Sequence, residues 1–220
     1  MSTDLPPRRD RVVAAVATTA EVLAHPELDA DLLAPWEHRR LNRIRVPARR
    51  DDVLAARLLL RLCVSHFTGR APDAHELVQF CPECGRYEHG RPSLRDSPRT
   101  GVSMSHADGL VAAAAGPGAV GIDVEPSTRR PGPIAVLRRM LPEAAAEAAV
   151  TSQDPGPGLL RAWVRREALL KAGGAGLPLL EWEDPGRGAT AAVASAAPVD
   201  VRSGITEPGR RAGAGRSPAA

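Results

Sequence analysis

The stretch GLVAAAAGPGAVGIDVE, residues 109–125, is the most informative part of the sequence for the fold. Residues 109–115 form an apolar run of strand length, and residues 116–118, Gly-Pro-Gly, are typical of a tight turn. Residues 120–124 predict a second strand. We therefore expect a hairpin whose second strand ends in acidic residues.

The acidic end of this stretch holds its most distinctive side chains. Successive residues of a strand point to opposite faces, so Asp123 and Glu125 should face one side while Ile122 and Val124 face a core. Two carboxylates on one face suit Mg²⁺ or Mn²⁺, which prefer oxygen ligands. Exposed acids at a strand end have the same spacing, so the pair alone leaves both interpretations open.

The segments before and after this stretch have weaker patterns. Apolar residues at three- and four-residue intervals, separated by arginines, predict helix within residues 37–68. Apolar patterns also predict a strand and a helix start at 11–24 and helices at 134–150 and 159–172. Segments rich in glycine and proline predict loops at 69–101 and 154–158. One or two strands are expected after residue 177.

The composition limits the classes of protein to which the chain can belong. Its 220 residues, 43% of them hydrophobic, suffice for one sizeable core or for two small lobes. No apolar run approaches the roughly 18 residues of a membrane span. The N-terminal residues lack the compact apolar core of a signal peptide. We expect a cytoplasmic protein with no membrane segment.

The charged residues favour small anionic partners. The net charge is +3, and Lys171 is the only lysine among 29 basic residues. The arginines are scattered rather than grouped in blocks, which argues against a surface dedicated to nucleic acid. A modest basic excess suits nucleotides, phosphates or acidic proteins.

The segment Trp163-Val-Arg-Arg-Glu-Ala-Leu-Leu-Lys171 is the second distinctive feature. Glu167 and Lys171 are four residues apart, so a helix places them on one face. They can form a surface ion pair there, or they can act as a third carboxylate and a phosphate contact. The glycines that follow, at positions 173, 174 and 176, allow the backbone to pass close to another group.

Two further segments offer hydrogen-bond donors for phosphate. Ser105 and His106 precede the apolar run of residues 109–115, and no G-x-S-x-G sequence surrounds them to indicate a hydrolase. Both side chains can donate to phosphate oxygens, although a histidine in a loop is also common without a ligand. Residues 89–92, His-Gly-Arg-Pro, predict a rigid turn that presents Arg91, a bidentate phosphate donor.

Cys81-Pro-Glu-Cys84 has the spacing of half a zinc site. A closed site needs two more ligands, and the sequence offers His89, Cys63, His66 or His75 for them. Reduced thiols at a turn would have the same spacing. The three cysteines do not form a disulfide framework in a chain of this length.

Together these segments resemble the 4′-phosphopantetheinyl transferase superfamily, and specifically its Sfp-type members. The resemblance covers roughly residues 37–177. It rests on the order of four motifs: Gly90-Arg91-Pro92, Ser105-His106, the G-[IV]-D-x-E strand from Gly121 to Glu125, and the W-x-x-[KR]-E-A-x-x-K helix from Trp163 to Lys171. Arg166 stands where the family often has lysine.

The resemblance implies a role for each matching residue. Asp123, Glu125 and Glu167 match the ligands of Mg²⁺, or of Mn²⁺ in its place, and Glu167 also matches the general base. Arg91, Ser105 and His106 match contacts to the phosphates of coenzyme A. Lys171 matches a catalytic residue that contacts the diphosphate. Arg57 matches a contact to the adenosine 3′-phosphate. Arg40 and Arg43 fall near further contacts in a looser alignment.

The resemblance also implies a fold and an activity. We expect an α+β protein of two similar lobes related by pseudo-two-fold symmetry, over residues 1–115 and 116–200, with a disordered tail at 201–220. Coenzyme A should bind between the lobes. A monomer should transfer its 4′-phosphopantetheine arm to a serine of an apo acyl or peptidyl carrier protein, in secondary metabolism, and release 3′,5′-ADP.

Two other classes of function remain open at the level of the sequence. The region after Leu177 has few apolar residues, so the chain can be an impaired paralogue that binds coenzyme A or carrier protein without transfer. An Arg-rich nucleic-acid module with zinc on Cys81 and Cys84 is the third class.

Overall fold

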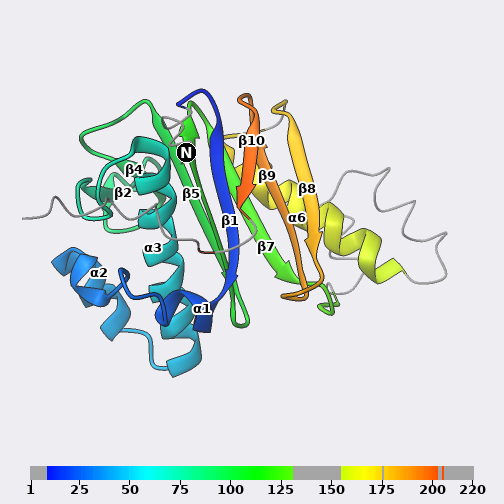
Figure 1. Cartoon of the computed structure of the whole chain (residues 1–220), viewed down its shortest axis with the longest axis horizontal. Coiled ribbons are helices and arrows are strands. Elements are labelled where there is room, and N and C mark those ends of the chain that lie inside the picture. The colour runs from blue at the N-terminus through cyan, green and yellow to red at the C-terminus, as the bar shows by residue number, and fades with distance from the viewer. Residues whose placement is uncertain (1–8, 131–154, 175, 203–204, 206–220) are drawn as a thin grey trace, which may run out of the picture.

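The computed structural model describes residues 9–130, 155–174, 176–202 and 205, and Figure 1 shows their arrangement. The mixed α+β composition that we predicted is confirmed. The elements are β1 (Val12–Thr18), α1 (Thr19–Leu23), the 3-10 helix η1 (Ala30–Leu32), α2 (Pro35–Asn42), α3 (Pro47–Thr68), β2 (Leu77–Cys81), β3 (Arg86–Tyr87), β4 (Arg91–Leu94), β5 (Thr100–Ala107), β6 (Leu110–Pro117), β7 (Val120–Pro126), α6 (Pro155–Ala172), β8 (Leu179–Asp184), β9 (Ala189–Ser195) and β10 (Val199–Arg202).

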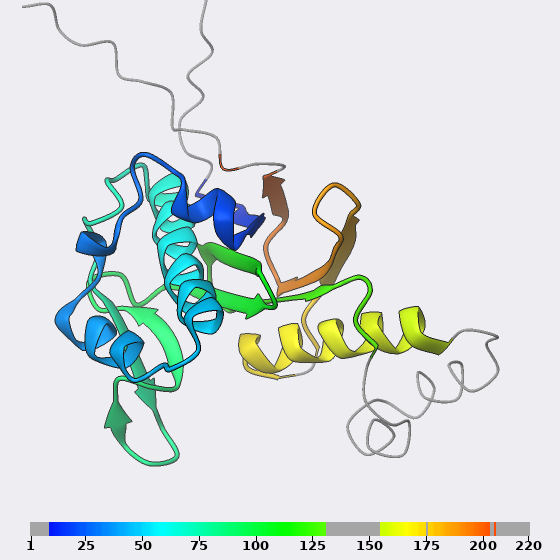
Figure 2. The same ribbon diagram turned by 90° about the horizontal axis from the view of Figure 1, so that it is seen from below.

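Two sheets pack against each other between two long helices (Figures 1 and 2). The first sheet has the strand order β10-β1-β6-β5, and the second has the order β7-β9-β8. Helix α3 covers the outer face of the first sheet, and α6 covers the outer face of the second. A small sheet, β3-β2-β4, lies beside α3 and β5.

Strand β1 shows how the sequence produces this layering. Its residues alternate between two apolar faces, and nearly all are buried. Val13, Ala15 and Ala17 pack toward α3, while Val12, Ala14 and Val16 pack against the second sheet. A strand covered on both faces reads as a continuous apolar run rather than as an alternating one.

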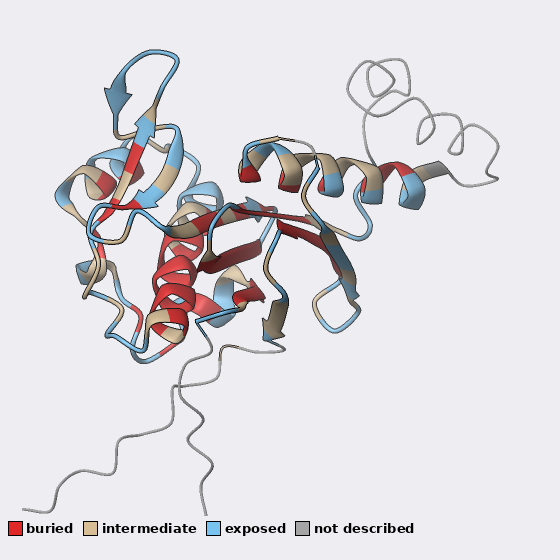
Figure 3. Ribbon diagram, turned by 90° about the horizontal axis from the view of Figure 1, so that it is seen from above, coloured by how far each residue is buried: buried red, intermediate tan, exposed pale blue. Residues whose placement is uncertain are grey.

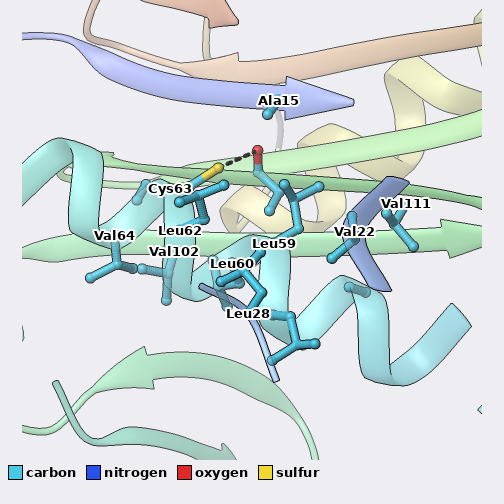
Figure 4. Packing of buried hydrophobic residues seen from close by; sticks show 14 of the residues in the cluster. Ala15, Val22, Leu28, Leu59, Leu60, Leu62, Cys63, Val64, Val102 and Val111 are labelled. Atoms are coloured by element: carbon cyan, nitrogen blue, oxygen red, sulfur yellow. Dashed lines mark hydrogen bonds between the residues drawn. The ribbon is translucent and has the colours of Figure 1, made fainter. Parts of the chain in front are cut away.

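Helix α3 is the centre of the larger core (Figures 3 and 4). It begins with Pro47 in its first turn, and it ends at Thr68, where Gly69 caps it with a left-handed φ of 71°. Leu59 and Leu60 are fully buried. The Cys63 thiol lies 3.5 Å from the Ala113 carbonyl of β6 (Figure 4), and burial raises the pKa of this thiol to about 12. Cys63 is therefore a core residue.

A buried ion cluster fixes α2 on α3. The Glu37 carboxylate of α2 accepts a hydrogen bond of 2.6 Å from Arg57 and another from Arg61, both on α3. Arg57 also donates to the Gln79 side chain at 2.9 Å, and its guanidinium lies over the Trp36 ring. Burial lowers the pKa of Arg57, because the interior disfavours the charged form. The one carboxylate therefore serves two guanidinium groups, and its removal would leave both of them without a counter-charge.

The predicted hairpin between β6 and β7 is wrong. Strand β6 instead pairs with β5 through the turn at Asp108-Gly109, and β7 pairs with β9 in the other sheet. Both edges of β6 are occupied, since β1 pairs with its other side. Gly116-Pro-Gly118 therefore leads the chain from one sheet to the other, where Ile122 and Val124 cover the face of the first sheet.

Other boundaries also differ from the sequence prediction. The strand and helix start at 11–24 are confirmed, and so is the helix at 159–172. Helix α6 already begins at Pro155, so the predicted loop at 154–158 is wrong where it is described. The predicted helix at 37–68 is interrupted between Asn42 and Pro47, where Pro47 starts a new helix. The predicted helix at 134–150 lies outside the described residues.

Two regions hold more strand than the sequence suggested. Residues 69–101 were expected as loops, yet they contain β2, β3, β4 and the start of β5, which are short and largely exposed on one side. After residue 177 come β8, β9 and β10. Strand β9, ATAAVAS, is fully buried although alanine is a weak strand former, because the small side chains fit between α6 and the first sheet. No helix in the described ranges has the length and apolarity of a membrane span.

Candidate functional site

Several of the predicted polar residues lie where α6 packs on β7. Gly121 lies closest to the helix: a Cβ atom there would be 2.0 Å from the Ala168 carbonyl oxygen and 2.4 Å from the Ala172 nitrogen. Only glycine permits this approach. It brings the last turns of α6 onto the side of β7 that holds Asp123 and Glu125.

Strand β5 borders the same place from the first sheet. Val102 packs into the core with α3, so the alternation of β5 turns Ser103 and Ser105 toward β7 and α6. The Ser103 hydroxyl accepts a hydrogen bond of 3.1 Å from the Ile122 backbone N–H. This bond ties the two sheets together beside the site.

A buried hydrogen-bonded cluster joins the three elements. The Lys171 ammonium of α6 donates to Asp123 Oδ1 at 2.6 Å and to the Ser105 hydroxyl at 2.8 Å. The Ser105 hydroxyl in turn donates to Asp123 Oδ1 at 2.6 Å. Asp123 is 7% exposed, whereas Lys171 keeps 30% of its side chain in contact with solvent. The cluster therefore offers a positive charge at the edge of an otherwise buried site.

The second oxygen of Asp123 has no hydrogen-bond partner among the described residues. Asp123 Oδ2 is fully buried, and a buried carboxylate oxygen without a partner costs free energy. Such an atom is available to a cation. The free oxygen is the observation on this site that most directly favours a metal ion.

Glu125 lies two residues further along β7 and is half-buried. Burial raises the pKa of its carboxyl above the ordinary value, although hydrogen bonds from Arg129, at 2.5 Å, and from the side chain of Trp163 oppose this effect. A cation beside the carboxylate would favour its charged form. Arg129 is a neighbour that the sequence analysis did not single out.

The position of Glu167 follows from the direction of α6. Trp163, Glu167 and Lys171 are successive members of one i, i+4 stripe. Trp163 contacts Glu125 and Lys171 contacts Asp123, so Glu167 lies between these two contacts on the side of α6 that faces β7. Its carboxylate is 3.1 Å from Arg166 and 26% exposed. The spacing allowed an ion pair between Glu167 and Lys171. In the structure Lys171 instead pairs with Asp123, and Glu167 pairs with Arg166.

These three carboxylates have the donor chemistry of a magnesium site. Asp123 and Glu125 share one side of β7, and Glu167 approaches from the helix. Their oxygens do not form a cluster within 4.8 Å of one another; among the described residues, Cys81, Cys84 and His89 form such a cluster. The buried, partnerless oxygen of Asp123 nevertheless fits a cation, so we regard the residues as compatible with Mg²⁺.

Residues 119–194 match the family model of the 4′-phosphopantetheinyl transferase superfamily. This segment is a 4′-phosphopantetheinyl transferase superfamily domain. The resemblance seen in the sequence is thereby confirmed for the part that holds Asp123, Glu125, Glu167 and Lys171. No curated protein matches the chain.

Arg91 reaches the transferase domain from β4, outside the matched segment. Its guanidinium donates to the Leu170 carbonyl oxygen at 3.3 Å, at the end of α6. A Cβ atom at Gly173 would be 3.2 Å from Arg91 Nη1, so the glycine leaves room for the arginine. A cavity of about 780 Å³ lies here, and Arg91, Lys171 and Ser103 are among its lining residues.

His106 lies on the other side of β5 from Ser105. The alternation of β5 turns it toward α3, where Asp52 favours its charged form, and Lys171, Arg49 and Arg40 disfavour it. The pKa of His106 is lowered, chiefly because the packed surroundings disfavour the imidazolium even though part of the side chain is exposed. His106 is thus adjacent to the transferase domain but outside the Asp123 cluster.

The other predicted arginines are separate from this site. Arg57 is 1% exposed within the Glu37 cluster, a position that favours a structural role over contact with a phosphate. Arg40 donates to the Glu88 carbonyl oxygen at 2.9 Å, and Arg43 is exposed. Ser103 is a site neighbour that the sequence analysis missed as a contact, although its spacing of two residues from Ser105 could have indicated it.

Gly121→Val should separate α6 from β7 in the transferase domain. Valine suits a strand, so the expected cost comes from the helix backbone that its side chain would meet. Overpacking of this kind lowers the free energy of unfolding by about 1–3 kcal/mol. Urea unfolding followed by circular dichroism measures it. Gly158→Ala, in open space on α6, is the matched control and should be neutral or stabilising; equal behaviour of the two variants would contradict the close approach.

Proposed function

We propose that the protein transfers the 4′-phosphopantetheine arm of coenzyme A to a serine of an apo acyl or peptidyl carrier protein and releases 3′,5′-ADP. The observation that supports this most is the Lys171–Ser105–Asp123 cluster, beside a cavity and largely within the matched domain. We assign the chain to the Sfp type, with similar lobes at 1–115 and 116–200 and coenzyme A between them, and propose that it acts as a cytoplasmic monomer in secondary metabolism.

The charges of the site suit a diphosphate. Lys171 and Arg91 both line the cavity, and Ser105 can donate to a phosphate oxygen once it turns from Asp123. His106 approaches from the other side of β5. Two cations and a hydroxyl can hold the diphosphate while the adenosine end extends away from the carboxylates.

The carboxylates would hold the metal ion. Asp123, Glu125 and Glu167 would bind Mg²⁺, or Mn²⁺ in its place, and the metal would stabilise negative charge that develops on the diphosphate. In its absence the Lys171 ammonium forms an ion pair with Asp123 Oδ1 at 2.6 Å.

The remaining chemistry is a displacement at the β-phosphorus. A bond forms between the carrier serine oxygen and this phosphorus, and the bond from the phosphorus to the oxygen of 3′,5′-ADP breaks. Glu167 accepts the serine proton, since its carboxylate is partly exposed beside the site. Lys171 stabilises the charge that the leaving 3′,5′-ADP gains.

The activity is tested by incubating the full chain with coenzyme A, Mg²⁺ and an apo carrier protein. We expect the carrier mass to rise by about 340 Da, the mass of one phosphopantetheine arm. A carrier with its acceptor serine changed to alanine should gain nothing. No gain with several carriers would contradict the proposed transfer, including the case in which calorimetry still detects binding of coenzyme A.

A further inference from the structure

The β2–β3 hairpin gathers three metal-binding side chains away from the carboxylates. Cys81 ends β2, Cys84 lies in the turn, and His89 follows β3. Their ligand atoms all lie within 4.8 Å of one another, and Cys84 Sγ is 3.1 Å from His89 Nε2. In a tetrahedral zinc site, bonds of about 2.3 Å to sulfur and about 2.0 Å to nitrogen place the ligand atoms roughly 3.5–4 Å apart. The three atoms are therefore nearly in position for one ion.

The backbone of the turn supports the cluster. The Gly85 N–H donates to the Cys81 carbonyl oxygen at 2.9 Å, and Gly85 has a φ of 66° that favours glycine. The backbone N–H groups of Cys84 and Glu83 hydrogen-bond to the Cys81 sulfur. The turn is thus built around the Cys81 sulfur.

We propose that Cys81, Cys84 and His89 bind one Zn²⁺, with a fourth position open to water or a small ligand. Two sulfurs and an imidazole favour zinc over the Mg²⁺ that the carboxylates suit. Among the described residues, no further cysteine, histidine or carboxylate joins the cluster. Cys63 is in the core, and His75 pairs with Asp96 at 2.7 Å. His66 lies in the last turn of α3 and is not part of the cluster.

A zinc ion on the β2–β3 hairpin would have a structural role. Strand β3 has two residues and is exposed, and a hairpin this short is marginal in stability by itself. After His89, Gly90 lies so close to β2 that an added Cβ would be 2.4 Å from the Phe80 carbonyl oxygen. The next residue is Arg91, which reaches Leu170 of α6. A zinc ion that fixes the hairpin therefore also fixes the strand that presents Arg91.

Metal analysis of the purified full chain tests the proposal. After addition of Zn²⁺ under reducing conditions and gel filtration in metal-free buffer, we expect about one zinc per chain. Cys84→Ser and His89→Ala should lower this content at least about fivefold, because two ligands are too few for tight binding. Glu83→Ala, which changes an exposed residue of the same turn and no proposed ligand, should keep it.

A second measurement identifies the ligands and covers the case of a variant that misfolds. Co²⁺ bound to the wild-type chain should give thiolate-to-cobalt charge-transfer bands and the d–d bands of a tetrahedral site, and added imidazole should shift them by entering the open position. Substoichiometric zinc in the reduced wild type, a Cys81–Cys84 disulfide that forms instead, or full zinc content in Cys84→Ser would overturn the proposal. None of these results depends on transfer activity.

Discussion

Glu167→Gln should lower the rate of phosphopantetheine transfer by about 10²–10⁴-fold, the usual contribution of a general base. The amide keeps the shape of the side chain but cannot accept the serine proton. The binding of coenzyme A should change by less than about threefold, since the cationic groups that we assign to the diphosphate are unchanged. Transfer kinetics and calorimetry measure the two quantities separately.

Glu181→Gln is the matched control for this variant. Glu181 is an exposed residue of β8. Its carboxylate lies 3.7 Å from Arg165 of α6, the helix that carries Glu167, and its substitution should leave transfer unchanged. Raising the Mg²⁺ concentration separates two roles of Glu167. A loss of rate that more Mg²⁺ restores would show that Glu167 acts as a metal ligand and would contradict its role as the proton acceptor.

Glu37→Ala should lower the free energy of unfolding by about 3–5 kcal/mol, the cost of breaking a buried ion pair from one side. Glu37 is fully buried, and its removal leaves the guanidinium groups of Arg57 and Arg61 inside the protein without a counter-charge. It also removes the hydrogen bond of 2.9 Å that the Glu37 carboxylate accepts from the Ala34 N–H at the start of α2. Urea unfolding of the two proteins measures the difference.

An exposed ion pair provides the comparison for Glu37. Glu76 and Arg95 are 2.9 Å apart with more than half of each side chain exposed, and Glu76→Ala should cost less than about 1 kcal/mol. A similar, small change in both variants would mean that water reaches the Glu37 cluster. Glu37→Ala should also loosen α2 from α3, which hydrogen exchange of α2 would detect.

The elements that the sequence predicted well are those with a strong apolar period. Strand β7 alternates apolar residues, which face the first sheet, with glycine and acidic residues, which face α6, so its period of two is visible. Helix α6 buries one apolar face, so its period of 3.6 residues is visible as well. Strand β9 gives little signal because its alanines are buried on both sides, where space rather than hydrophobicity selects them. The pairing of β6 with β5 and not β7 depends on which edges are already occupied, and no local pattern contains that information.

In the candidate site, too, sequence spacing predicted which side chains share a face but not which residues from other elements they contact. The spacing of Asp123 and Glu125 correctly predicted that both would face one side, toward α6. The partner of Lys171 could not be read from spacing, because Asp123 comes from another element 48 residues away. Arg57 was assigned to a ligand through its resemblance alone. Its burial with Glu37 depends on the packing of α2 against α3, which becomes visible only in three dimensions.

Strand β10 has a consequence for the synthesis of the protein on the ribosome. It pairs in parallel with β1 at the edge of the first sheet, where Arg11 and Val199 are 188 residues apart. At about 5–20 residues per second, roughly 10–40 s separate the synthesis of β1 from that of β10. Throughout that time one edge of β1 has unpaired backbone groups, which other nascent chains can bind. Of the described strands, β1 therefore waits longest for its last partner, and its open edge is the one most exposed to pairing with another chain.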